Sequence, residues 1–385
     1  MARWGPPGRK VRRPGGYSAF IPAPLPPPIE WTAELVSALS EADRQVGRLA
    51  GEGRQLPNPH LLIRPFVRRE AVLSSRIEGT QATLGELLAA EAGAAVDRSP
   101  DDLREVGNYV TALEHGVGRL ERFPLSLRLV RELHAKLMAG VRGDHAAPGE
   151  FRRTQNWVGP SGATPATASY VPPPPEELMV CLGPWEKFLH ERALPPLVHV
   201  ALAHYQFEAI HPFLDGNGRV GRLLITLSMI ERGILPAPLL YLSAYFEATR
   251  AEYYARLRGI QEGAEWEAWV RYFLDGVARQ SEDALRRAEQ VNSLLADWRR
   301  RLADAPSPVA VQLVDLLAEN PYWTVRRAAS RLGVAFTTAQ RAVERLRAAS
   351  IVTQVGEGRR DRVYCATDLL RILEAPSALA RRSRS

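Results

Sequence analysis

The most informative stretch of this sequence is His211-Pro212-Phe213-Leu214-Asp215-Gly216-Asn217-Gly218-Arg219-Val220-Gly221-Arg222. It places a possible general base, a carboxylate, a flexible turn and two guanidinium groups close together in the sequence. The apolar run 223–230 that follows is typical of a helix, so the turn should lie at a helix N-terminus. Unpaired backbone N–H groups and the helix dipole favour anions there. We therefore expect a phosphate site, with His211 placed to take a proton from an attacking hydroxyl.

The same run also contains the Gly216-x-Gly218-x-x-Gly221 spacing of dinucleotide-binding loops. That fingerprint requires a β-strand before the glycines and an acidic residue about 20 positions later. Residues 197–210, which precede the run, instead carry apolar side chains near helical spacing. Because the strand–helix–strand surroundings are missing, we reject a dinucleotide-binding domain.

The run is similar to the signature of Fic-domain proteins, His-x-Phe-x-Asp/Glu-Gly-Asn-Gly-Arg-x-x-Arg, and fills every defining position. The resemblance implies a mainly helical fold and transfer of AMP from ATP, with Mg²⁺, to a hydroxyl group of a target protein. It implies that His211 is the catalytic base, that Asp215 binds the metal and that Arg222 grips the γ-phosphate. The ATP-binding residues that it implies are His211, Pro212, Phe213, Leu214, Asp215, Gly216, Asn217, Gly218, Arg219 and Arg222.

A second motif lies upstream, at Ser74-Ser75-Arg76-Ile77-Glu78-Gly79. Ser74 and Glu78 are four residues apart and would share one face of a helix, and Gly79 suits the helix C-terminus. The motif resembles the inhibitory sequence of Fic proteins that carry it before the catalytic core. The resemblance implies that Glu78 pairs with Arg222 and keeps the γ-phosphate from its productive position. The alternative is an ordinary exposed glutamate at a helix end.

Residues 149–159 resemble the flap of Fic enzymes. Phe151, Arg153, Gln155 and Trp157 alternate, and residues 159–162 are a turn signal, so we predict a β-hairpin. The resemblance implies that this flap aligns the target chain beside the histidine by strand-like pairing. The target-positioning residues would be Thr154, Gln155, Asn156 and Trp157. An ordinary surface hairpin is the alternative.

Two further residues are weaker candidates for ATP binding. Gln206 lies five positions before His211 and could face the nucleotide, although a place on the helix surface is the alternative. Tyr245 could stack on adenine, although an apolar aromatic run is often part of a core. His199 and His204, on the helix before the motif, are expected to make structural hydrogen bonds.

Composition favours a cytoplasmic enzyme with no membrane span or signal peptide, because the chain lacks a long apolar run and an apolar leader. Cys181 and Cys365 lie far apart and predict neither a disulfide framework nor a zinc site. The net charge of +7 suits acidic partners such as ATP or nucleic acid, but arginine-rich genome composition explains it equally well. By resemblance we expect a homodimer.

We divide the chain into an arm rich in Pro, Gly and Arg (1–30), a helical region with the inhibitory motif (31–100), a Fic core (101–303), a compact module (309–375) and a basic tail (376–385). Polyproline II or disorder is expected in the arm. Helices are predicted at 31–49, 65–77, 83–95, 101–120, 126–138, 174–190, 196–210, 218–232, 248–259 and 265–302.

Residues 309–375 predict a C-terminal winged-helix domain. Its helices would span 309–317, 325–332 and 337–348, and its wing strands, 351–355 and 362–366, would flank the turn 356–360. The third helix would expose Thr337, Gln340, Arg341 and Arg345, residue types that contact DNA bases and phosphates. A docking or dimerisation module is the alternative.

Two classes of function therefore stay open. The first is a self-inhibited protein adenylyltransferase that acts on a Ser, Thr or Tyr hydroxyl of a target protein and also modifies itself. The second is a DNA-binding regulator whose Fic core senses nucleotide, against which the intact His211 argues, since a sensor needs no base. Removal of AMP, with Glu78 orienting water, is a variant of the first class.

Overall fold

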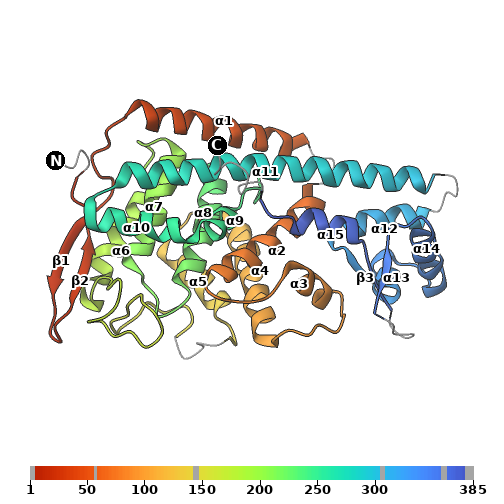
Figure 1. Cartoon of the computed structure of the whole chain (residues 1–385), viewed down its shortest axis with the longest axis horizontal. Helices are drawn as coiled ribbons and strands as arrows, with labels where there is room; N and C mark the ends of the chain where they lie inside the picture. Colours follow the sequence, from red (N-terminus) through yellow and green to blue (C-terminus); the bar gives the residue numbers. More distant parts are fainter. Residues whose placement is uncertain (1–4, 56–58, 142–146, 304–307, 357–361, 378–385) are drawn as a thin grey trace.

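The computed structural model describes residues 5–55, 59–141, 147–303, 308–356 and 362–377, and it confirms the mainly helical fold (Figure 1). The helices before the C-terminal module are α1 (Ala33–Gln55), α2 (Pro59–Ile77), α3 (Leu84–Glu91), α4 (Pro100–Leu120), α5 (Leu127–Leu137), the 3₁₀ turn η2 (Pro175–Glu177), α6 (Leu178–Leu189), α7 (Pro196–Ile210), α8 (Asn217–Glu231), α9 (Ser243–Ala248), α10 (Arg250–Gly263) and α11 (Trp266–Arg301). In Figure 1, α1 runs beside α11 along one edge of the molecule.

The centre of the fold is the antiparallel pair of α7 and α8, joined by the short loop 211–216. Thirteen of the fifteen residues of α7 are buried, which is why its sequence is apolar on every face rather than on one stripe. Helix α8 is buried almost as completely. Helices α5, α6 and α11 enclose the pair and thereby fix the position of the loop between them.

Several helices differ from the prediction: α1 and α10 end later, at Gln55 and Gly263, and α2 and α9 differ in other ways. Helix α2 begins at Pro59 rather than at Pro65, so Pro65 lies inside it. Proline removes the hydrogen bond that its own nitrogen would have made and crowds the carbonyl four residues earlier, but the helix continues past it to Ile77. Helix α9 was not predicted, because its aromatic run has no helical periodicity of its own.

The N-terminal arm is not the polyproline or disordered segment that its composition predicted. Strand β1 (Gly8–Arg12) pairs antiparallel with β2 (Ser18–Pro22), so the described part of the arm contains a β-hairpin. Its second strand buries Ala19, Phe20 and Ile21 against the helical body, and the Phe20 N–H donates to the carbonyl of Val171 at 2.8 Å. Tertiary burial overrides the composition here.

The predicted flap hairpin is also wrong in its detail. Among the described residues of 147–175, the pairing is a single antiparallel bridge between Val158 and Tyr170. The side chains of Arg152 and Asn156 are buried and donate to backbone carbonyls of 210–213. These contacts hold the segment as an irregular loop on the catalytic turn, where an alternating strand would have pointed the same side chains outward.

The predicted elements of the C-terminal module lie near their expected positions, as α12 (Pro308–Glu319), α13 (Val325–Leu332), α14 (Phe336–Ala348), β4 (Thr353–Val355) and β5 (Val363–Cys365). Strand β3 (Tyr322–Thr324) and helix α15 (Thr367–Glu374) were not predicted. The strands form an antiparallel sheet in the order β3-β5-β4. The linker 304–307, most of the predicted wing turn (357–361) and most of the basic tail (378–385) lie outside the described residues, and the winged-helix assignment stays a prediction.

Candidate active site

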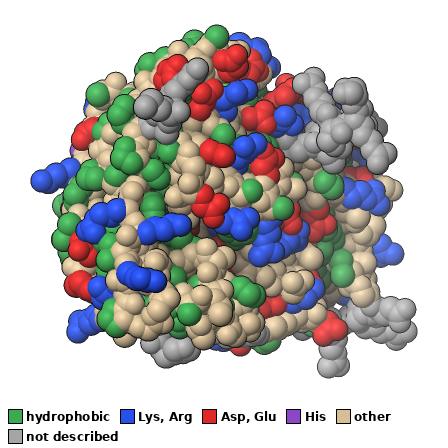
Figure 2. All heavy atoms as spheres, turned by 60° about the vertical axis from the view of Figure 1, so that its left-hand side comes forward, with side chains coloured by type: hydrophobic (Ala, Val, Ile, Leu, Met, Phe, Trp, Pro, Cys, Tyr) green, Lys and Arg blue, Asp and Glu red, His purple; other side chains and the backbone are tan. Residues whose placement is uncertain are grey.

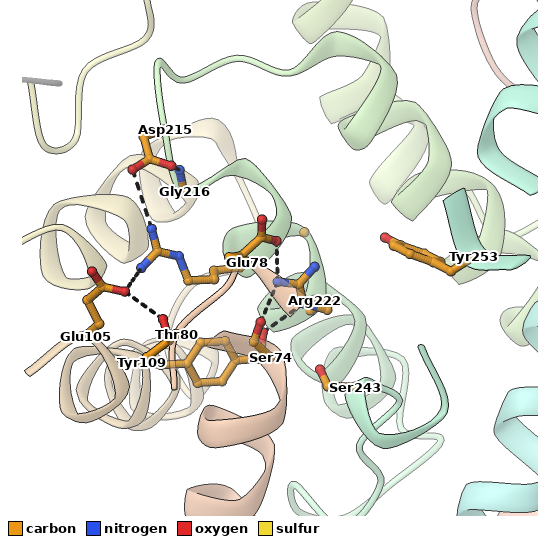
Figure 3. A network of polar contacts seen from close by, with 12 residues as sticks. Ser74, Glu78, Thr80, Glu105, Tyr109, Asp215, Gly216, Arg222, Ser243 and Tyr253 are labelled. Atoms are coloured by element: carbon orange, nitrogen blue, oxygen red, sulfur yellow. Dashed lines mark hydrogen bonds and ion pairs between the residues drawn. The ribbon is translucent and has the colours of Figure 1, made fainter. Parts of the chain in front are cut away.

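A cavity of about 760 Å³ opens at the N-terminus of α8. Its walls come from the loop 211–216, from the end of α7, from the flap at 157–160 and from α10. Glu78, which follows α2, and Arg222, on α8, meet inside it, as Figure 3 shows. The motif at residues 74–79 and the run at residues 211–222 therefore lie in one site.

His211 lines this cavity in an uncommon backbone conformation. It ends α7 with φ 50° and ψ 61°, in the left-handed region that a side-chain-bearing residue adopts only when neighbours fix it. Its carbonyl accepts hydrogen bonds from Arg152 Nε at 2.9 Å and from Asn156 Nδ2 at 3.3 Å. The flap thus holds the histidine in place.

The ring of His211 is neutral and has a defined tautomer. Burial lowers its pKa to about 4, against the opposing effects of the Glu208 carbonyl and of nearby carboxylates. Nδ1 lies 3.3 Å from the Glu208 carbonyl oxygen, so Nδ1 carries the proton. Nε2 is left as the unprotonated nitrogen that a general base requires.

Asn217 and His134 hold the turn from inside. The Asn217 amide accepts from the Phe213 N–H and donates to the Phe213 carbonyl, both at 2.8 Å. His134 accepts the Gly149 N–H at Nδ1 (2.8 Å), so its Nε2–H donates to the Asp215 carbonyl (3.0 Å). Because the Asn217 side chain is occupied, its phosphate contact would come from its backbone N–H.

Asp215 and Arg219 differ in exposure. The Asp215 carboxylate is 55% exposed and lies 3.7 Å from Arg219, while Arg219 is buried and bonds Glu105 at 3.4 Å. Gly216 has φ 77°, which glycine adopts without strain. Pro212 and Phe213 are buried beneath the loop, where Phe213 stacks on His134 at 3.7 Å. Leu214 lines the cavity and is exposed.

The upstream motif engages Arg222 through its Nε and Nη2 atoms. Its Nε donates to Ser74 Oγ at 2.8 Å, and its Nη2 donates to the Ser74 carbonyl at 2.9 Å and to Glu78 Oε1 at 2.7 Å. Ser74 lies in the last turn of α2, Glu78 directly after it, and Gly79 continues the turn with φ 105°. The pairing implied by the inhibitory motif is therefore present.

The charges around Arg222 reinforce the pair. Burial alone would lower the pKa of Arg222, but Glu78 and Glu208 raise it above its ordinary value. Burial alone would raise the pKa of Glu78, but Arg222 lowers it. Burial raises the pKa of Glu208, on the cavity wall, to about 7 in spite of Arg222. Glu78 is thus the carboxylate that stays ionised beside Arg222 at neutral pH.

Gln206 and Tyr245 do not reach the cavity. The Gln206 amide donates to the Ala23 carbonyl at 2.9 Å and ties the N-terminal segment to α7. The Tyr245 hydroxyl donates to Asp275 at 3.0 Å, and its ring packs directly against Gly276 of α11. Both candidates for ATP binding are corrected by this placement, since each is buried in a structural contact.

Sequence reasoning missed the wall formed by α10. Tyr253 and Tyr254 line the cavity together with Arg250, Leu257 and Arg258. Tyr253 faces Arg222 in Figure 3, and its hydroxyl contacts His204 at 2.9 Å. The predicted structural roles of His204 and His199 are confirmed, as His199 contacts the Phe188 carbonyl at 2.6 Å. No motif in α10 signals the wall.

The flap residues divide between two roles. Trp157 lines the cavity, is 40% exposed and donates from Nε1 to the Ala163 carbonyl at 2.8 Å. Thr154 is exposed, and its carbonyl accepts from Arg152. Gln155 donates to the Pro172 carbonyl at 3.1 Å, and Asn156 is buried against the loop 211–213. Only Trp157 and Thr154 are presented outward.

Comparison with protein families gives two adjoining matches. A model described as "Fic/DOC family N-terminal" matches residues 36–118, and one described as "Fic/DOC family" matches residues 124–229. The second match contains the whole of the run 211–222, and the first contains the inhibitory motif. The chain therefore carries a Fic N-terminal domain and a Fic domain.

Individual Fic proteins are similar over part of the chain. "Protein adenylyltransferase Fic" of Drosophila virilis is 32% identical over 205 residues, which are 52% of this chain and 39% of that protein. The Drosophila melanogaster protein of that name is 31% identical over 205 residues, covering 52% of this chain and 38% of its own length. The chain thus covers well under half the length of these relatives.

Solved Fic structures share the fold. A Fic family protein from Desulfovibrio desulfuricans G20 aligns with a TM-score of 0.59 and 21% identity, covering 89% of this chain and 98% of that one. Fic-1 from C. elegans aligns with a TM-score of 0.52 and 27% identity, covering 66% and 74%. In the part of the chain that the structure describes, no helix is long and apolar enough to cross a membrane.

Proposed function

We propose that this Fic protein transfers AMP from ATP to a Ser, Thr or Tyr hydroxyl of a target protein, and that Glu78 restrains the reaction. The observation that carries the proposal is the neutral His211 beside a glycine turn at the N-terminus of a buried helix. The naming of the Drosophila relatives as protein adenylyltransferases supports it.

In the proposed reaction His211 Nε2 takes the proton of the acceptor hydroxyl. The hydroxyl oxygen then forms a bond to the α-phosphorus, and the bond from that phosphorus to the bridging oxygen of the β-phosphate breaks. AMP remains on the target, and pyrophosphate leaves with the electron pair. Because the base is neutral and held in one tautomer, positioning supplies much of the rate.

The phosphates would bind the turn and the first residues of α8. Gly216 and Gly218 allow close approach of the backbone, and the N–H groups that begin the helix point toward the anion. Arg222, which we propose binds the γ-phosphate, lines the same cavity from the second turn of α8. Arg219 would contribute positive charge from beneath, since it is buried and pairs with Glu105.

The residues fit magnesium bound together with ATP. The described residues contain no cluster of three or more His, Cys, Asp or Glu side chains that would hold an ion unaided. Asp215 presents an exposed carboxylate at the turn, and Mg²⁺ in nucleotide sites is usually held by one or two carboxylates plus phosphates and water. When bound, the ion would neutralise phosphate charge.

Restraint follows from the engagement of Arg222. A guanidinium that donates to both Ser74 and Glu78 has fewer donors for a γ-phosphate, and the Glu78 carboxylate repels one. Glu78 also stands over Gly218: a Cβ added there would lie 2.2 Å from Glu78 Oε1. The carboxylate therefore occupies space above the turn that the phosphates need.

The target would lie along the outward residues of the flap, Thr154 and Trp157, while Asn156 positions the loop. By resemblance to the family we also propose self-modification, a homodimer and a cytoplasmic location. Removal of AMP by the same site, with Glu78 orienting water, is a further activity that the exposure of the Glu78 carboxylate to the cavity favours.

The test is label transfer from ATP carrying the label on its α- or its γ-phosphate. The Glu78→Gly variant, alone and combined with His211→Ala, is incubated with Mg²⁺ and cell lysate; His190→Ala, an exposed histidine, is the matched control. We expect protein labelling only from the α-label, lost with His211→Ala and kept with His190→Ala. ATP binding without transfer from either label would overturn the proposal in favour of nucleotide sensing.

A further inference from the structure

The C-terminal module segregates its charge by face. From Val325 to Arg347, which spans most of α13 and α14, the sequence holds six arginines and a single acid, Glu344. The other acids described in the module are also paired: Asp315 bonds Arg299, Glu319 bonds Arg64 of α2 and Arg331 of α13 itself, Asp368 bonds Arg371, and Glu374 accepts the Gly85 N–H. The face in Figure 2, toward the other end of the molecule, instead intersperses basic and acidic side chains.

The two helices are arranged to present that charge. Gly333 ends α13 with φ 65°, and a short turn leads into α14. One side of α14 is buried through Ala339, Ala342, Val343 and Leu346. The opposite side exposes Thr337, Gln340, Arg341 and Arg345. In Figure 1, α14 lies at the end of the molecule farthest from the N-terminal hairpin.

We propose that this surface binds double-stranded DNA, with α14 in the major groove. The groove admits one α-helix, and glutamine and arginine side chains can make paired hydrogen bonds to adenine and guanine edges. A helix–turn–helix places its second helix in this way. Six arginines against one glutamate in this segment match the phosphate backbone in sign.

A seat for backbone phosphate adjoins the helix. A hollow of about 450 Å³ is lined by Thr324, Arg326, Arg327, Ser330 and Arg331. Arg327 stacks over Trp323 at 4.6 Å, and its buried Nη1 has no hydrogen-bond partner among the described residues. Hydroxyl and guanidinium donors converge there, as phosphate contacts beside a recognition helix require.

The module is fixed to the catalytic body. Arg287 of α11 donates to the carbonyls of Ile372 and Ala375 and bonds Asp283, and the Asn320 amide donates to the Leu88 carbonyl at 3.1 Å. Helices α12 and α15 also pack on α2, which leads into the inhibitory motif. Helix α14 itself makes none of these contacts, whereas Arg331 of α13 shares Glu319 with Arg64 of α2.

Fluorescence anisotropy with a labelled mixed-sequence 30-base-pair duplex tests the proposal on the full chain, from 50 to 200 mM salt. The variant is Arg341→Ala/Arg345→Ala; the matched control is Arg44→Ala/Arg48→Ala, two exposed arginines at the same spacing on α1. We expect the variant to weaken binding at least ~10-fold, because each paired contact to a base edge contributes ~1–3 kcal/mol. The control should bind like wild type.

Circular dichroism melts confirm that each variant is folded, and polyglutamate serves as a competitor. Wild type that does not bind the duplex at 50 mM salt would overturn the proposal. So would an equal loss in the variant and the α1 control, or displacement of DNA by polyglutamate at an equal charge concentration, which would indicate an acidic protein as the partner. The outcome does not depend on AMP transfer, because no ATP is present.

Discussion

Nη2 of Arg222 lies 2.7 Å from Oε1 of Glu78, although 144 positions separate the two residues in the sequence. The pair joins the end of α2 to the helix that begins at the phosphate-binding turn. A side chain that ATP would need is thus already bonded within the chain. We therefore expect the proposed transfer to depend on how firmly α2 holds Arg222.

Removing the Ser74 hydroxyl should release part of this restraint. In Ser74→Ala the Arg222 Nε loses its 2.8 Å acceptor, while the bonds to the Ser74 carbonyl and to Glu78 remain. One hydrogen bond to a charged group contributes ~1.5–3 kcal/mol. The two remaining bonds still hold Arg222, so the effect on the rate should be smaller than that free energy implies. We expect a rise in transfer rate of about 3- to 10-fold. Ser75→Ala, a neighbouring buried serine whose hydroxyl has no partner among the described residues, should leave the rate unchanged; equal effects of the two would count against the account.

The rate should depend on pH with an acid limb far below that of a free histidine. Burial lowers the pKa of His211 to about 4, so the base stays unprotonated down to about pH 5. Measured on Glu78→Gly, the rate should fall only as the pH approaches 4. A bend near pH 7 would come from Glu208, whose pKa burial raises to about 7, and should vanish in Glu208→Gln. A fall in rate with a midpoint near pH 6.5 that persists in Glu208→Gln would contradict the assignment of buried, neutral His211 as the base.

Buried histidines should make the fold less stable in mild acid. Burial lowers the pKa of His134 and His199 to about 4 and that of His204 to about 3. An unfolded histidine titrates near 6.5, so between pH 6.5 and 4 the unfolded state binds protons that the folded state does not. Stability is therefore complete above about 6.5 and declines below it, by up to ~1.4 kcal/mol per pH unit for each histidine.

Thermal unfolding from pH 8 to 4.5 checks this linkage. The melting temperature should be level above pH 7 and should fall steadily below 6.5. The His199→Gln variant removes one of four such histidines, His211 being the fourth, and should show a shallower decline, even if its melting temperature is lower throughout. A melting temperature that is constant or rises from pH 6.5 to 5 is the opposite of the expected sign.

Asn156 should act on catalysis through the loop rather than through the target. Its amide donates to the carbonyls of Phe213 at 2.7 Å and of His211 at 3.3 Å. Loss of these bonds in Asn156→Ala should lower kcat about 10-fold with little change in the KM for ATP, because His211 loses its fixed position. Asn156→Asp cannot donate and should behave alike. A change confined to the KM for the target protein would instead support the original prediction that Asn156 contacts the target.

The sequence predicted the parts of the site that a local pattern defines. The run 211–222 contains its base, turn and arginines together, and the spacing of Ser74 and Glu78 follows from the helix period. Gln206 and Tyr245 were misplaced because the direction of a side chain on a buried helix depends on its neighbours, here Ala23 and Gly276. A single residue in an apolar run contains no information about which partner it meets.

The remaining differences have the same physical origin. The arm pairs as a hairpin because Phe20 and its neighbours find a surface to bury against, which composition does not reveal. The flap is irregular because Arg152 and Asn156 turn inward to satisfy buried carbonyls. Long periodic helices such as α4 and α11 were predicted to within a few residues, since their pattern is set by their own sequence.

The central claim is that Glu78 restrains transfer by holding Arg222, and its most direct test is the initial rate of transfer from α-labelled ATP. Wild type is compared with Glu78→Gly and with Glu121→Gly, an exposed glutamate that likewise follows directly after a helix. Loss of a charge-assisted bond of ~1.5–3 kcal/mol corresponds to a rate increase of about 10- to 100-fold for Glu78→Gly. The account predicts that increase with an unchanged rate for Glu121→Gly. Equal rates for wild type and Glu78→Gly would contradict it.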